Sequence, residues 1–128
     1  MGTFPIFVLE MGNVPIFEEG GMGESARVLG NVATRMLFEN DRVRIWEMDL
    51  PPGGRSDVHR HDLDYVLVIL EGDRIAAEPE PDTAGAFREP IEFPVEPGQT
   101  IYVNRGGIET AINVGQKRYR EILIELKS

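Results

Sequence analysis

The amino-acid sequence predicts an all-β fold, a small barrel or sandwich of antiparallel strands formed by one domain. The first observation is a series of short apolar segments, rich in β-branched residues, that begins near Thr34. The second is the regular spacing of turns rich in proline and glycine between those segments. No segment has a helical period of adequate length. A chain of 128 residues allows one domain and is too short for two well-buried ones.

Residues 1–33 are predicted to form an arm or a pair of edge strands that precedes the barrel. They hold two short apolar runs, residues 5–7 and 15–17, and a glycine-rich stretch at 20–23 that breaks any regular element. Apolar side chains in an arm have to be buried on the chain's own barrel or on a partner subunit. We therefore expect an arm at 1–33 and a barrel at 34–128.

The barrel strands are predicted from apolar runs that end at turn signals. The run at 65–70 is continuous and β-branched-rich, which favours a strand buried on both faces. Residues 78–90 are rich in proline, acidic residues and glycine, which indicates a loop. In chain order the expected strands are Arg42–Leu50, Tyr65–Leu70, Ile91–Val95, Thr100–Val103, Glu109–Val114 and Tyr119–Leu126.

Charge excludes one class of partner. The chain has 22 acidic and 13 basic residues, which gives a net charge of −9. Phosphate backbones repel such a chain, so we expect no nucleic-acid partner. The basic residues at 117–120 are followed closely by Glu121 and Glu125, and this segment is interpreted as a solvated strand end.

The sequence contains no cysteine, which excludes disulfides, thiolate metal sites and a cysteine nucleophile. The apolar run at 4–9 is too short to cross a membrane and lacks the basic segment of a secretory signal. We therefore expect a cytoplasmic protein with no membrane partner.

His59 and His61 are the two histidines of the chain and the first candidates for chemistry. Two residues apart on a strand, their side chains point to the same face, so both imidazoles can converge on one ion. The alternative is a chance pair of surface histidines, which the spacing taken alone favours.

The surroundings of this pair resemble the two conserved motifs of the cupin superfamily. The first motif is matched by Gly53, the histidine pair and Gly72, and the second runs from Pro97 through Gly106 to Asn113. The resemblance covers about half of the chain and implies a small jelly-roll-like cupin β-barrel of antiparallel strands. A weaker similarity, through Glu39–Arg44, Asp64–Val66 and Ile124–Lys127, links the chain to small single-domain cupins associated with β-alanine degradation.

The same resemblance implies a metal site with two exchanged ligands. Metal-binding cupins have a glutamate where this chain has Tyr65, and a histidine where it has Glu109. One interpretation is that His59, His61 and Glu109 bind a divalent ion, with Tyr65 as a weak ligand or proton donor and Tyr65 and Glu109 as the catalytic residues. These ligands suit Fe, Mn, Ni, Cu or Zn without choosing among them.

In the other interpretation the site has lost its metal, and Tyr65 and Glu109 line the pocket and hydrogen-bond to each other. Asp64 is one residue short of the glutamate position and is expected to point to the opposite face. Arg55, Arg60 and Arg105 are candidates to face the cavity, where a guanidinium would bind a carboxylate. Their alternative is the ordinary one of solvated arginines on turns.

Three functions follow as hypotheses. The leading one is a metal-dependent enzyme of the oxygenase, isomerase or lyase type that acts on a small polar, carboxylate-containing metabolite. The rivals are a metal-free cupin that binds a small molecule, and an oligomeric scaffold. A homodimer is expected in each case, because small open barrels have exposed edges and apolar faces that pairing covers.

Overall fold

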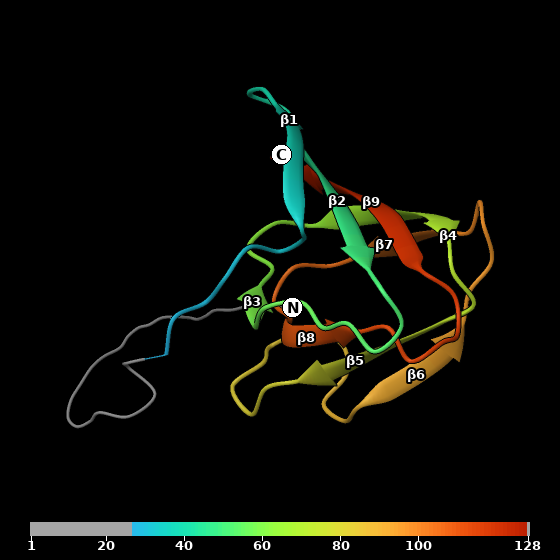
Figure 1. Ribbon diagram of the computed structural model, residues 1–128. Helices are drawn as coiled ribbons and strands as arrows, with labels where there is room; N and C mark the ends of the chain where they lie inside the picture. The colour runs from blue at the N-terminus through green and yellow to red at the C-terminus, as the bar shows by residue number, and fades with distance from the viewer. Residues whose placement is uncertain (1–26, 128) are drawn as a thin grey trace.

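The computed structural model describes residues 27–127, which form two antiparallel β-sheets packed face to face (Figure 1). Nine strands and no helix occur in this part of the chain. The strands are β1 (Arg35–Glu39), β2 (Val43–Leu50), β3 (His59–Arg60), β4 (Tyr65–Glu71), β5 (Arg74–Pro79), β6 (Ile91–Pro94), β7 (Thr100–Val103), β8 (Ile108–Ile112) and β9 (Tyr119–Leu126).

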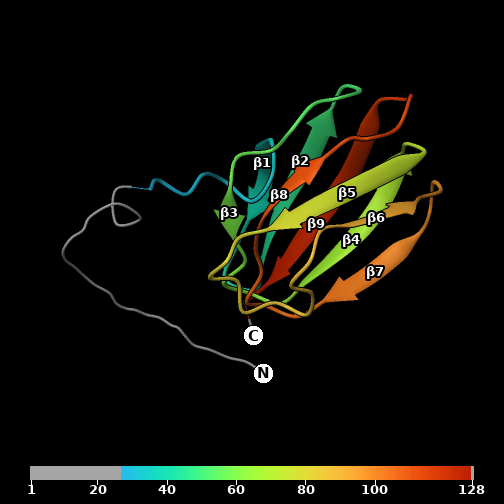
Figure 2. The same ribbon diagram turned by 90° about the horizontal axis from the view of Figure 1, so that it is seen from below.

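The sheets have the strand orders β1-β2-β9-β4-β7 and β3-β8-β5-β6. Figure 2 shows the second sheet lying across the first. Every strand pair is antiparallel, so the predicted all-β antiparallel barrel is confirmed. Among the described residues, no helix is long and apolar enough to cross a membrane.

Strand β9 shows how the sequence builds the interior. It lies between β2 and β4, and its residues are alternately buried and half-buried. Because side chains on a strand alternate between faces, Glu121 and Glu125 share the inner face with Leu123. These two carboxyl side chains are 5% and 1% exposed. The burial of these two acidic residues was not predicted from the sequence.

Strand β4 corrects a second expectation. Tyr65 and Ile69 are buried on the inner face, but Leu70 is 36% exposed and Val66 and Val68 are half-buried. The strand is thus buried on one face and not on both, because only one face of the five-stranded sheet packs against the other sheet. The ends of the other predicted strands agree with the structure within a few residues. Strands β1, β3 and β5 were not among the predicted strands.

The core lies between the two sheets. Its buried side chains include Trp46, Met48 and Leu123 from the five-stranded sheet and Ile75 from β5. Burial of each such side chain contributes about 1.5–3 kcal/mol. The two sheets are therefore held together mainly by this apolar layer, which also forms the walls of the cavity described below.

Residues 27–33 lie against the barrel. The Gly30 N–H donates to the Val58 carbonyl at 2.8 Å, and Val32 and Ala33 belong to the core. Arg27 pairs with Asp82 at 2.8 Å. The apolar runs at 5–7 and 15–17 lie outside the described residues, so the boundary of an arm at residue 33 stays a prediction.

Candidate functional site

Strand pairing brings His59 and Glu109 together. They are directly opposite each other in the β3–β8 register, so their side chains leave the sheet on the same face. His61 follows β3 and is held by two backbone hydrogen bonds of 2.8 Å, from its N–H to the Gly107 carbonyl and from the Gly106 N–H to its own carbonyl. All three side chains therefore project from backbone fixed by hydrogen bonds.

Gly106 has to be glycine for this arrangement. Its φ of +114° lies in a region that side chains rarely adopt. A Cβ atom there would also lie 2.9 Å from the Ala84 carbonyl oxygen. The glycine of the second motif thus lets the turn between β7 and β8 approach the loop after β5 and hold His61 in place.

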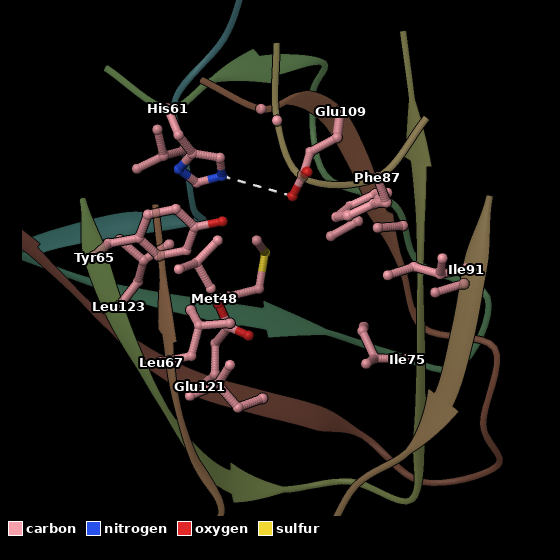
Figure 3. A pocket seen from close by; sticks show the side chains of 18 of the residues that line it. Met48, His61, Tyr65, Leu67, Ile75, Phe87, Ile91, Glu109, Glu121 and Leu123 are labelled. Carbon is pink, nitrogen blue, oxygen red and sulfur yellow. Dashed lines mark ion pairs between the residues drawn. The ribbon is translucent and has the colours of Figure 1, made fainter. Parts of the chain in front are cut away.

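His59, His61 and Glu109 form a compact group of potential metal ligands. One ligand atom from each lies within 4.8 Å of the others. The two imidazoles are 1% and 2% exposed, and the Glu109 side chain is 13% exposed. Figure 3 shows the His61 Nε2 atom facing the Glu109 carboxylate, 3.6 Å from its Oε2 atom.

The hydrogen bonds around His59 leave one ring nitrogen available. Its Nδ1–H donates to the Asp57 carbonyl at 2.8 Å, which directs the lone pair of Nε2 to the other side of the ring. Metal-bound histidines have this kind of outer partner. Burial and the neighbouring His61 lower the pKa of His59 to about 4, so its imidazole is neutral at pH 7.

The other two groups complete a site of mixed charge. Burial by itself raises the pKa of Glu109, but the His61 and His59 imidazoles hold it below the ordinary value, so Glu109 is ionised at pH 7. The Nδ1 atom of His61 is buried and has no hydrogen-bond partner within residues 27–127. Two imidazoles and one carboxylate are a donor set that suits a divalent transition metal.

Tyr65 lies beside this group on β4. Its ring stacks on His61 with a centroid distance of 4.0 Å and an interplanar angle of 19°. Burial and the nearby Glu109 carboxylate raise the pKa of Tyr65 well above the ordinary value, so the hydroxyl keeps its proton. The hydroxyl points into the pocket (Figure 3), and within residues 27–127 no hydrogen bond joins it to Glu109.

Asp64 points away from the site, as expected. Its carboxylate accepts hydrogen bonds from the Arg105 backbone N–H at 2.9 Å and from the Tyr102 hydroxyl at 3.1 Å. Asp64 and Tyr65 therefore point to opposite faces, as neighbouring side chains in an extended chain do, and of the two only Tyr65 faces the pocket.

The three arginines that were candidates for the cavity do not line it. Each is paired with a carboxylate outside the pocket: Arg55 with Glu78 at 3.0 Å, Arg60 with Asp62 at 2.8 Å, and Arg105 with Asp64 at 3.1 Å. The alternative interpretation, that these are solvated arginines on turns, is therefore the correct one, and none of the three guanidinium groups is placed to bind a ligand carboxylate in the cavity.

The site opens into a cavity of about 330 Å³ between the two sheets. Its walls are mostly apolar, with Met48, Leu67 and Leu123 on one side and Ile75, Phe87 and Ile91 on the other (Figure 3). No lysine or arginine lines it among the described residues. A ligand of this cavity would thus have an apolar body, and its polar groups would have to meet the few polar side chains of the walls.

Sequence analysis missed a second polar group in the cavity. Glu121 lines it from β9 and accepts a hydrogen bond from the Tyr119 hydroxyl. Burial raises the pKa of Glu121 to about 7. The signal in the sequence was its place in the alternation of buried residues on β9, between Tyr119 and Leu123.

The chain matches the family model described as auxin binding protein over residues 5–126. Auxin-binding protein 1 of Arabidopsis thaliana is 31% identical to it over 94 residues, which cover 73% of this chain and 46% of that protein. Auxin-binding protein T85 of Nicotiana tabacum is 21% identical over 112 residues, 88% of this chain and 60% of that protein. The chain thus spans about half the length of the curated relatives it matches.

Solved structures show the same fold. A cupin domain from Bordetella pertussis Tohama I aligns with a TM-score of 0.62 and 23% identity over 77% of this chain and 100% of that chain. An RmlC-like cupin with a double-stranded β-helix fold, from Methanocaldococcus jannaschii, aligns with a TM-score of 0.56 and 18% identity over 83% and 93%. The predicted cupin fold is confirmed, whereas the finer similarity to cupins of β-alanine degradation stays a prediction.

Proposed function

We propose that this chain, which belongs to the auxin binding protein family, is a cupin that binds a divalent metal ion and, beside it, a small organic acid with an apolar body. The observation that carries the proposal is the convergence of His59, His61 and Glu109 at the end of an apolar cavity. The family supports a small-molecule ligand, because its described relatives are named for the binding of auxin.

The three residues fit a metal ion. Ligand atoms that share one ion at about 2.0–2.2 Å are about 3.3–3.6 Å apart in a tetrahedral site. The donors of His59, His61 and Glu109 lie within 4.8 Å of one another, and His61 Nε2 and Glu109 Oε2 are already 3.6 Å apart, so the widest pair has to approach by about 1 Å. The Asp57 carbonyl already holds His59 in the tautomer that ligates through Nε2.

Charge supports an acidic ligand. Two neutral imidazoles and one carboxylate around a divalent ion leave a net charge of +1, and Tyr65 adds none because its hydroxyl keeps its proton. The ion, when bound, supplies the one positive charge among the groups that line the cavity. A ligand carboxylate would neutralise this charge, and the apolar walls would cover the rest of the molecule.

The metal site is tested by elemental analysis of protein purified without chelator. We expect about one divalent ion per chain in the wild-type protein and none in H59A or H61A. Arg60→Ala is the matched control, because Arg60 lies between the two histidines but pairs with Asp62 at the surface. Stoichiometric metal in both histidine variants would contradict the proposal, and a wild-type protein that stays metal-free after supplementation with zinc would favour the metal-free cupin.

The ligand class is tested by thermal unfolding with indole-3-acetic acid as the probe, and with indole and acetate as its two separate parts. The complete acid should raise the Tm of the zinc-loaded protein. At a ligand concentration a hundredfold above Kd, the free energy of unfolding should increase by about 2.7 kcal/mol. The increase should disappear with EDTA and in H61A. Equal stabilisation with and without zinc would contradict the role of the metal.

Catalysis by the same site is the second candidate, and Tyr65 is the observation in its favour. Its neutral hydroxyl points into the cavity beside His61, where it can donate a proton to a bound substrate. Mass spectrometry of the acid after incubation with metal-loaded protein would detect conversion. Tyr65→Phe is then expected to bind the acid unchanged and to stop the conversion, and unaltered turnover in this variant would exclude the proton donor.

A further inference from the structure

The cavity has a second polar region, away from the metal-ligand group. Figure 3 shows Glu121 on the same wall as Leu67, with Met48 between it and the His61–Glu109 pair, and with Ile75 and Ile91 across the cavity. The carboxyl group of Glu121 is therefore surrounded by apolar side chains on the side where a ligand body would lie.

Glu121 lacks the partners that a buried carboxyl normally has. One oxygen accepts a hydrogen bond from the Tyr119 hydroxyl, and within residues 27–127 the other oxygen has no hydrogen bond and no basic side chain pairs with the group. The side chain is only 5% exposed. Because Glu121 lines the cavity, an N–H or O–H group of a ligand could donate to the oxygen that the fold leaves without a hydrogen bond.

Glu125, four residues further along β9, provides the contrast. Its Oε1 atom accepts hydrogen bonds from Arg44 Nε at 2.6 Å and from Trp46 Nε1 at 2.7 Å, so a basic side chain of the fold pairs with this carboxylate. It does not line the cavity. The two glutamates lie on the same face of one strand, but Glu125 is paired with an arginine away from the cavity, whereas Glu121 lines the cavity and no described basic side chain pairs with it.

We infer that Glu121 is a specificity-determining residue, which accepts a hydrogen bond from an N–H or O–H group on the end of the ligand that points away from the metal-ligand group. This inference rests on the proposed function for the orientation of the ligand. It adds a chemical requirement: the apolar body carries a neutral hydrogen-bond donor opposite its acid group. A cationic donor is disfavoured because Met48, Leu67 and Leu123 line this end of the cavity.

The test uses indole and benzothiophene, two bicyclic rings of similar shape that differ in the N–H donor. Neither has a carboxylate, so both are titrated calorimetrically into metal-free protein, and failure of the metal proposal does not affect the result. We expect the wild-type protein to bind indole roughly tenfold more tightly, a difference of about 1.4 kcal/mol. In Glu121→Leu the two affinities should agree within about twofold.

Two further variants keep the test conclusive. The double variant Y119F/E121L removes both polar partners and so leaves no buried hydroxyl unpaired if E121L alone folds poorly. Glu89→Gln is the matched control, since it removes an exposed carboxyl group that does not line the cavity and should keep the preference for indole. The inference is overturned if the wild-type protein does not prefer indole, or if the preference survives in a folded variant without Glu121.

Discussion

The stability of the metal-free protein should depend on pH through Glu121, and Glu121→Gln removes that dependence. Burial raises the pKa of Glu121 from 4.5 to about 7, so between these values the folded state holds a proton that the unfolded chain has lost. The stability contributed by the proton is complete below pH 4.5 and is lost as the pH rises to 7. A shift of about 2.5 pH units corresponds to roughly 3 kcal/mol of unfolding free energy.

His59 contributes with the opposite sign. Its pKa falls from 6.5 to about 4 on folding, so its contribution is complete above pH 6.5 and is lost as the pH falls towards 4. The two effects oppose each other between pH 4.5 and 6.5, and the wild-type curve alone would conceal both. The difference between the wild-type protein and Glu121→Gln cancels His59 and isolates Glu121.

The assay is urea unfolding in EDTA at four pH values from 4.5 to 8. From the lowest to the highest pH, Glu121→Gln should gain roughly 3 kcal/mol relative to the wild-type protein. Glu89→Gln, which removes an exposed carboxyl from the loop after β5, is the control for the loss of one charge. If the difference between Glu121→Gln and wild type stays constant across this range, Glu121 is not buried as the structure has it.

Three other variants test the fold around the site. Asn113→Ala should lose about 2–4 kcal/mol in urea unfolding, because the fully buried amide donates to the Leu50 and Lys117 carbonyls; a loss below about 1 kcal/mol would contradict this. Gly106→Ala should lower both the Tm and the metal affinity, because alanine is strained at a φ of +114° and the turn holds His61. A lower Tm with unchanged metal content would mean that this turn does not position the metal ligand. If the expected homodimer pairs through the outer face of the five-stranded sheet, Phe38→Asp, at a position 52% exposed, should give a monomer in light scattering; a persistent dimer would mean that the interface lies elsewhere.

Turn signals and alternation predicted most of the barrel because they act locally. Proline and glycine end a strand whatever it pairs with, so the runs at 43–50 and 119–126 were recognised. Strand β5 was not, since its residues run directly into the acidic, proline-rich segment at 78–90. The one-sided burial of β4 depends on which strands and layers surround it, and a continuous apolar run contains no information on that.

The candidate site divides in the same way. Convergence of His59 and His61 follows from the period of two along a strand, but their meeting with Glu109 depends on pairing across strands β3 and β8 and was inferred only by resemblance. Two locations stayed open for the arginines, because their sequence neighbourhood says nothing of the carboxylates that pair with them in space. Glu121 was not predicted to line the cavity, although its place in the alternation of β9 was a signal of burial.

The two polar regions of the cavity determine how a ligand can lie in it. At one end, a divalent ion held by His59, His61 and Glu109 would present a net positive charge, which attracts a carboxylate. At the other end, Glu121 is an acid that burial keeps near its point of ionisation, and a ligand carboxylate placed beside it would meet like charge without a compensating cation. The reversed orientation therefore loses the attraction at the metal and adds a repulsion in a region of low dielectric constant. A ligand with an acid group and a distant N–H donor is therefore expected to bind in one orientation, which would bring its acid group next to the Tyr65 hydroxyl.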